Sequence, residues 1–188
     1  MKAMLTTRLL RSTKGQTLIE LTLMFPIMLA LLYGAVEIGS IISTYLTITH
    51  TTREGANLTS RGTVPSTALD AIEAAADPTI RSSNKTQWKI IYSKISQVPG
   101  KPCPPKPCEY RVEQQIPRGS FNQNSKIGLE SNTVPITLSG IQDVEPGQIF
   151  HGIEVYYDYT PNVMTYIGSN LINKTFYERT IFTDVNGR

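Results

Sequence analysis

The residues whose types and spacing could do chemistry stand near the N-terminus, where Gly15 and Gln16 precede a lone acid, Glu20. An almost unbroken apolar run, Leu21–Ile42, follows directly. A carboxylate beside hydrocarbon is costly unless it is paired. If the chain is cut after Gly15, the new α-amino group of Gln16 becomes a cation that can pair with Glu20 of its own chain or a neighbour. The spacing therefore predicts a processing site and a charged contact at the mouth of a membrane-length helix.

The charge distribution is that of a short basic leader. Four cations and no acid precede Gly15, namely Lys2, Arg8, Arg11 and Lys14. Without residues 1–15, 14 of the 18 Lys and Arg remain to face 15 Asp and Glu, so the formal charge of +3 falls to near neutrality. The mature chain thus gives no case for nucleic-acid binding, which needs a clustered basic surface. Since positive flanks stay in the cytoplasm, residues after about Thr44 are expected on the far side of a membrane, which in a bacterium is the periplasm.

The two cysteines, Cys103 and Cys108, enclose a short proline-rich loop. An exported domain lies in an oxidising compartment where disulfides persist, so a Cys103–Cys108 disulfide is the favoured interpretation. A metal site is disfavoured, because two thiols leave a tetrahedral shell incomplete and no histidine stands nearby. The spacing is also not that of a C-x-x-C redox motif.

Neither histidine, His50 or His151, stands in a catalytic or metal-binding motif, and both are expected to be structural. The sequence contains no HExxH, G-x-S-x-G or Walker pattern. It therefore predicts neither an enzyme nor a cofactor.

One long helix is expected to position the N-terminal site. The chain divides into a leader at 1–15, a helix at 16–61 with its membrane span at about 21–42, and a head at 62–188. The span is about 33 Å long at 1.5 Å per residue, which is enough to cross a bilayer core. Pro26 should kink this helix.

Two features of the helix could contact other subunits. Ala35, Gly39 and Ser43 recur at i, i+4 and i+8, and such small residues let helices approach closely in lipid, although glycine is also common in membrane helices generally. Glu37 lies about 26 Å beyond Glu20 along the axis. It is expected either to pair with a neighbouring subunit or to reach the far headgroups.

The head is expected to be a small antiparallel sheet, which with the long helix makes an α+β fold. Strands are predicted at 87–96, 109–116, 134–138, 151–160 and 175–183, a helix at 67–76 with Ser66 as its cap, and a mobile polar loop at 117–132. In the clearest strand, Ile153, Val155, Tyr157 and Tyr159 alternate with Glu154, Tyr156 and Asp158, the pattern of a half-buried sheet. Tyr157 and Tyr159 are expected in the core.

Several motifs together resemble the TadE-like family, minor pseudopilins of the Tad (tight-adherence, or Flp) pilus. They are Gly15-Gln16-Thr17-Leu18-Ile19-Glu20, Phe25-Pro26, Val36-Glu37-Ile38-Gly39 and Thr52-Arg53-Glu54-Gly55-Ala56. The resemblance is close over residues 15–57 and returns faintly at the tyrosine-rich segment 155–161. The proline-cysteine loop has no counterpart in it.

The resemblance implies cutting between Gly15 and Gln16 by a prepilin peptidase. It also implies a pilin-like helix in the bacterial inner membrane, and partners among the other Tad pilins and the pilus-assembly platform proteins, with adhesion and biofilm formation as downstream results. The subunit would cross the membrane once, with its head in the periplasm, and could enter an extracellular pilus. The alternative is an uncleaved, signal-anchored periplasmic module that binds a ligand or a protein. Retention of residues 1–15 would distinguish this module from a pilus subunit.

Overall fold

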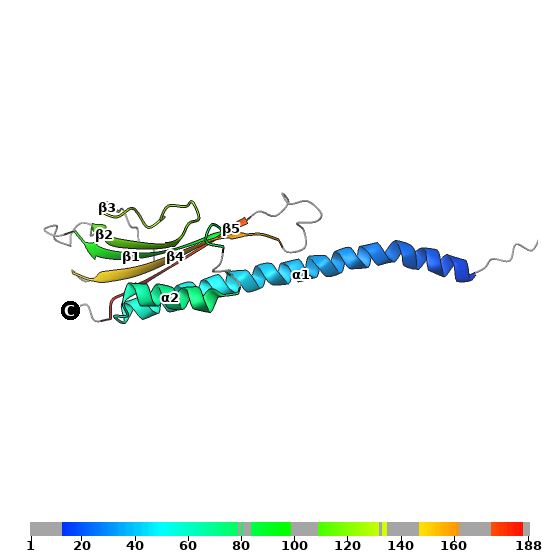
Figure 1. The fold of residues 1–188 in the computed structure, drawn as a ribbon, viewed down its shortest axis with the longest axis horizontal. Helices are drawn as coiled ribbons and strands as arrows, with labels where there is room; N and C mark the ends of the chain where they lie inside the picture. Colours follow the sequence, from blue (N-terminus) through cyan, green and yellow to red (C-terminus); the bar gives the residue numbers. More distant parts are fainter. Residues whose placement is uncertain are drawn as a thin grey trace, which may run out of the picture.

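The computed structural model describes residues 13–78, 80, 84–98, 109–131, 133–134, 147–161 and 174–185. Within them lie α1 (Thr13–Ser60), α2 (Pro65–Ala76), β1 (Trp88–Gln97), β2 (Tyr110–Gly119), β3 (Thr133–Val134), β4 (Ile149–Tyr159) and β5 (Lys174–Thr183). In Figure 1 the C-terminal half of α1 lies against a sheet, and its N-terminal half extends beyond it. The predicted α+β fold, a long N-terminal helix packed on a small antiparallel sheet, is confirmed.

The helix α1 is 48 residues long and continues through Pro26. Its first half is rich in leucine, methionine and alanine, which favour helix. Its second half is rich in threonine, which favours helix less. There the hydroxyl groups donate hydrogen bonds to backbone carbonyls four residues earlier, as Thr52 does to Ile48 at 2.6 Å and Thr59 to Gly55 at 3.1 Å. The buried hydroxyls of Thr52 and Thr59 are thereby satisfied without leaving the helix.

The sheet has the order β3-β2-β1-β4-β5, and all the pairs are antiparallel. β2 runs to Gly119, past the predicted end at residue 116, and so contains Pro117. Proline is tolerated there because β3 pairs only with Tyr110 and Arg111, which leaves the outer side of β2 at Pro117 a free edge among the described strands. The helix α2 begins at Pro65 rather than after a Ser66 cap, and proline suits the first turn because its missing N–H has no partner in a helix.

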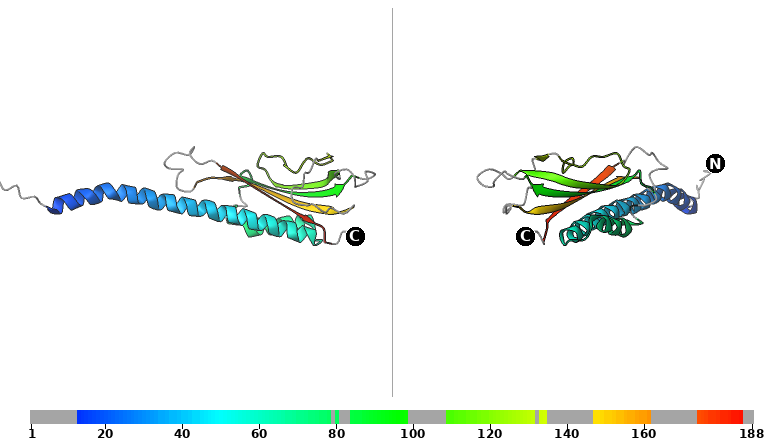
Figure 2. Two further views of the ribbon diagram at one scale, coloured as in Figure 1. Left: turned by 180° about the vertical axis from the view of Figure 1, so that it is seen from behind. Right: turned by 60° about the vertical axis from the view of Figure 1, so that its left-hand side comes forward.

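Both helices pack on the same face of the sheet (Figure 2). The main core lies in this layer, where Ile48 of α1 and Leu69 of α2 are fully buried with Ile90 and Val155 of the sheet. Tyr157 and Tyr159 belong to the same cluster, so their predicted core positions are confirmed. Each such side chain contributes about 1.5–3 kcal/mol by leaving water. A smaller cluster lies on the opposite face, under residues 120–131, and it contains Ile95, Tyr110, Val112, Ile127 and Phe150.

Gly55 lets the two helices approach closely. A Cβ atom at this position would lie 2.0 Å from Cδ1 of Ile72 and 2.6 Å from its Cγ1. Its neighbours Thr52 and Ala56 are fully buried, whereas Arg53 and Glu54 are exposed. Within this segment, the small residues Thr52, Gly55 and Ala56 are therefore buried against α2 and the sheet. The charged side chains of Arg53 and Glu54 face solvent.

Candidate functional site: the N-terminal helix and its junction with the head

The N-terminal half of α1 is a bare apolar rod. Thr17–Ser60 contains a stretch long and apolar enough to cross a membrane, and none of that stretch is buried against the rest of the chain. Most of its large apolar side chains are 46–70% exposed, among them Leu18, Leu21, Phe25, Met28, Leu32, Tyr33 and Val36. Exposing an apolar surface all round a helix is unfavourable in water and normal in lipid.

The predicted processing site lies at the start of this rod. α1 begins at Thr13, so the Gly15–Gln16 bond falls in its first turn. Glu20 is exposed one turn later. Residues four apart on a helix are neighbours, and side chains lean toward the N-terminus. Glu20 therefore leans toward the position where an α-amino group on Gln16 would lie.

Glu37 joins the helix to the head. Its side chain is only 2% exposed. The Tyr159 hydroxyl donates a hydrogen bond to its Oε1 at 2.5 Å, across 122 residues of chain. From the sequence, Glu37 was expected to pair with a neighbouring subunit or to reach the headgroups, and its contact with Tyr159 was not predicted. The only sequence signal for this contact was a tyrosine at the end of a strand with alternating apolar residues.

Aromatic rings surround this contact. The Tyr159 ring lies 5.8 Å from the ring of Phe176 in an edge-to-face arrangement, and Phe176 lies 6.3 Å from Tyr45 of α1. Burial raises the pKa of Tyr159 above its usual value, and the hydrogen bond to Glu37 acts in the same direction. The phenol is thus held in its neutral, donating form. At this junction a buried carboxylate is paired with a buried hydroxyl. The rings of Tyr45 and Phe176 form an apolar collar beside the pair.

Replacing Tyr159 by phenylalanine tests this junction. The ring and its packing remain, but Glu37 loses a charge-assisted hydrogen bond, which is worth about 1.5–3 kcal/mol. We expect Tyr159→Phe to lower the free energy of unfolding by this amount, measured by urea unfolding of the full chain in detergent with Trp88 emission as the signal. Tyr45→Phe, which removes an exposed hydroxyl at the same collar, is the control and should change stability by less than about 0.5 kcal/mol. Equal effects of the two variants would contradict a special role for the Tyr159–Glu37 contact.

The small-residue stripe lies on exposed surface. Ala35, Gly39 and Ser43 are all exposed, and a Cβ atom added to Gly39 would meet no atom within 4 Å. Ser43 also lines a groove of about 560 Å³ between α1 and α2. Its other lining residues are Leu46, Thr47, His50, Thr51, Glu54, Leu58, Ala71, Ile72 and Ala75. The stripe therefore runs from the bare half of α1 into a groove beside the head.

A second buried carboxylate lies on the far face of the sheet. Glu154 is fully buried and accepts hydrogen bonds from the Lys126 backbone N–H at 2.9 Å and the Tyr177 hydroxyl at 2.8 Å. The Ser125 hydroxyl also donates to it, and the Tyr156 hydroxyl, which donates to the Asn124 carbonyl at 2.9 Å, lies 3.4 Å from its Oε1. Burial raises the pKa of both tyrosines, and the Glu154 charge raises it further. The arrangement fixes residues 125–126 to the sheet.

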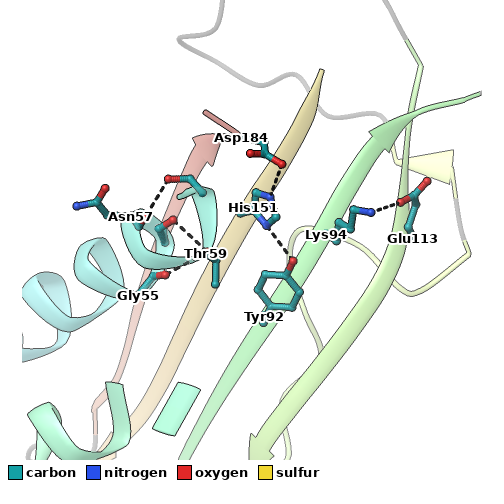
Figure 3. A network of polar contacts seen from close by, with 10 residues as sticks. Gly55, Asn57, Thr59, Tyr92, Lys94, Glu113, His151 and Asp184 are labelled. Atoms are coloured by element: carbon teal, nitrogen blue, oxygen red, sulfur yellow. Dashed lines mark hydrogen bonds and ion pairs between the residues drawn. The ribbon is translucent and has the colours of Figure 1, made fainter. Parts of the chain in front are cut away.

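A buried polar relay crosses the other face, where Figure 3 shows Tyr92, His151 and Asp184 in line. The Tyr92 hydroxyl lies 2.8 Å from Nδ1 of His151, and Nε2 lies 3.5 Å from an Asp184 carboxylate oxygen. Burial lowers the pKa of His151, although Asp184 acts in the opposite direction, and burial raises the pKa of Tyr92 to about 12. The relay thus joins the C-terminal segment to the sheet, and beside Asp184 the backbone N–H of Val185 donates to the Ser60 carbonyl and joins that segment to the end of α1.

In the part of the chain that the structure describes, no three His, Cys, Asp or Glu side chains are grouped so as to hold a metal ion. Cys103 and Cys108, with the predicted disulfide, lie outside the described residues. The candidate site thus consists of an exposed apolar helix, an acid near its start, and an internal hydrogen bond where the head begins.

Comparison with known proteins bears on this helix alone. The family model of TadE-like proteins matches residues 15–57, which confirms the resemblance seen in the sequence. No curated protein and no solved structure matches the chain. The matched segment extends from Gly15 through Glu20 and Glu37 to the Thr52–Ala56 segment that packs against α2.

Proposed function

We propose, with the TadE-like match of residues 15–57 as the premise, that this chain is a minor pilin-like structural subunit that takes part in assembling a Tad-type (Flp) pilus. The observation that carries the proposal is the bare apolar half of α1, which begins one turn after a Gly15–Gln16 bond and carries Glu20 at its start. A helix of this kind needs lipid or other apolar helices around it. Because the matching TadE-like family is a family of pilus-associated proteins, a structural role is favoured over a catalytic one.

In this proposal a prepilin peptidase of the bacterial inner membrane cuts between Gly15 and Gln16. The leader charges keep the N-terminus in the cytoplasm, and the head lies in the periplasm. Glu20 pairs with the new α-amino group of Gln16 in its own subunit or the next one. Ala35, Gly39 and Ser43 then pack against the helices of other Tad pilins, and the assembly platform receives the subunit.

The size of the head favours a minor subunit over a major one. The sheet and α2 cover one whole side of the C-terminal half of α1. A fibre made mainly of such subunits would have to space its helices around these heads. A low-copy position, at a tip or at initiation, avoids that constraint.

The intact mass of the chain, extracted from membranes of its native host, tests the proposal. We expect a mass that corresponds to a chain beginning at Gln16. Mass is preferable to N-terminal sequencing, since an N-terminal glutamine can cyclise and block the reaction. A mass that retains Met1–Gly15, in a host with active prepilin peptidase, would sink the pilus proposal. The same spectrum without reductant tests the disulfide, because Cys103 and Cys108 would have lost two hydrogens.

A retained leader would promote the second candidate, an uncleaved anchored module that binds a ligand or a protein in the periplasm. The groove between α1 and α2 favours this candidate, because it is a recess of about 560 Å³ with apolar and polar lining.

A further inference from the structure

The head meets α1 at a definite level along the helix. Tyr159, the last residue of β4, bonds Glu37, and its register partner is Lys174, the first residue of β5. Phe176 then lies against Tyr45, and Val185, just beyond β5, reaches Ser60. β5 therefore runs alongside α1 from about Glu37 to Ser60, and the described head begins where the bare half of the helix ends.

This end of the sheet is unsuited to hydrocarbon. Thr160, Lys174 and Thr175 are exposed there, and β5 is the last strand of the described sheet. A strand edge that faces lipid would leave its backbone groups without partners, each at a cost of several kcal/mol. Submerging the Lys174 ammonium would add a further cost, which is about 2.5–3.5 kcal/mol at the bilayer centre and falls toward the surface. A bilayer reaching Ile42, five residues beyond Glu37, would submerge about 8 Å of this end.

We propose that the outer headgroup layer of the bilayer meets α1 at Glu37, and that the β4–β5 end of the head rests on it. The Lys174 ammonium suits the phosphates of that layer. The span is then Leu18–Val36, about 28 Å long, which matches a hydrocarbon core of about 30 Å. The inference rests on the anchoring role in the proposed function, and it moves the outer end of the span from Ile42 to Val36. Gly39 and Ser43 then lie outside the hydrocarbon, where a partner helix would meet them beside the head.

Tryptophan depth in a bilayer tests this boundary. The full chain carries one tryptophan, Trp88, which is 1% exposed in the head core and gives a constant background emission. Met28 and Ile42 are 64% and 53% exposed, so tryptophan at either position leaves the core intact. Each variant is reconstituted in phosphatidylcholine vesicles with and without acyl-brominated phosphatidylcholine. An unchanged urea midpoint of the Trp88 signal verifies that the head is folded.

We expect Met28→Trp to lose most of its added emission in the brominated vesicles and Ile42→Trp to lose none beyond the parent chain. Ile38→Trp, one residue past the boundary, should resemble Ile42→Trp. If Ile42→Trp is quenched as strongly as Met28→Trp, the boundary at Glu37 is overturned, but the role of α1 as a membrane anchor is retained. If Met28→Trp is not quenched, the helix does not lie in the bilayer, and the anchoring role fails together with the boundary.

Discussion

Replacing Glu154 by alanine is expected to lower the free energy of unfolding of the head by about 3–5 kcal/mol, the usual cost of breaking a buried charged network by removing one partner. The carboxylate is fully buried and accepts from three donors, on Ser125, Lys126 and Tyr177. Alanine would leave all three without this acceptor and would open a cavity. Buried donors without acceptors cost about 1–3 kcal/mol each, and some of them would regain water as residues 125–126 lift from the sheet.

The measurement is urea unfolding of the full chain in detergent, followed by Trp88 emission. Glu113→Ala is the matched control, because Glu113 is also a strand glutamate but forms a half-exposed ion pair with Lys94 at 3.1 Å (Figure 3). Pairs of that kind contribute about 0–1 kcal/mol. Glu154→Gln keeps one acceptor oxygen and should fall between the two. A loss for Glu154→Ala no larger than that for Glu113→Ala would refute the organising role of Glu154.

Replacing Glu20 by alanine is expected to abolish co-purification with the other Tad pilins while cutting after Gly15 remains largely intact. In the proposed function, the peptidase cuts the bond after Gly15, five residues away, and the Glu20 carboxylate pairs with the Gln16 amine only after the cut. Near hydrocarbon an amine without its partner costs about 3–5 kcal/mol, which is enough to lower association by about two to nearly four orders of magnitude. The stability of the head should not change, since Glu20 lies in the bare half of α1.

The test combines the intact mass of the membrane-extracted chain with pull-down of a tagged copy. Glu54→Ala is the control, because Glu54 is an exposed acid on the same helix, beside the head. Glu20→Gln separates charge from shape and should behave like alanine if pairing is the role. Undiminished co-purification of Glu20→Ala would exclude the pairing role. If the Glu20→Ala chain is left uncut, Glu20 acts in recognition by the peptidase instead of in assembly.

The parts of the fold that were predictable depend on local pattern. The apolar run marks the bare half of α1, and the alternation of Ile153, Val155, Tyr157 and Tyr159 marks β4 and its core face. Both signals come from side chains whose surroundings repeat along the element. The roles assigned to Gly15, Gln16 and Glu20 depend on the same kind of local spacing, and they stay predictions.

The contacts that were missed join residues far apart in the sequence. Glu154 and Tyr156 alternate with core residues, and this pattern predicts an exposed face; instead both are buried, because residues 120–131 cover them. The polarity of that segment indicated a mobile loop, but its Ser125 hydroxyl and Lys126 N–H are bonded to Glu154. Glu37 was missed similarly, since its partner Tyr159 stands 122 residues away. An acid in an apolar segment indicates that a partner exists without saying which one.

The way β5 runs alongside α1 has a mechanical consequence. Tension applied at the N-terminal end of the helix acts parallel to this contact and loads it in shear. In shear, the side chains between Glu37 and Ser60 share the force together, whereas a perpendicular pull would separate them one after another. The attractions between atom pairs are individually small and collectively large, so a contact that is loaded all at once resists far more than one that is peeled. A pull at the N-terminal end of α1 would thus reach the head with little extension of the subunit.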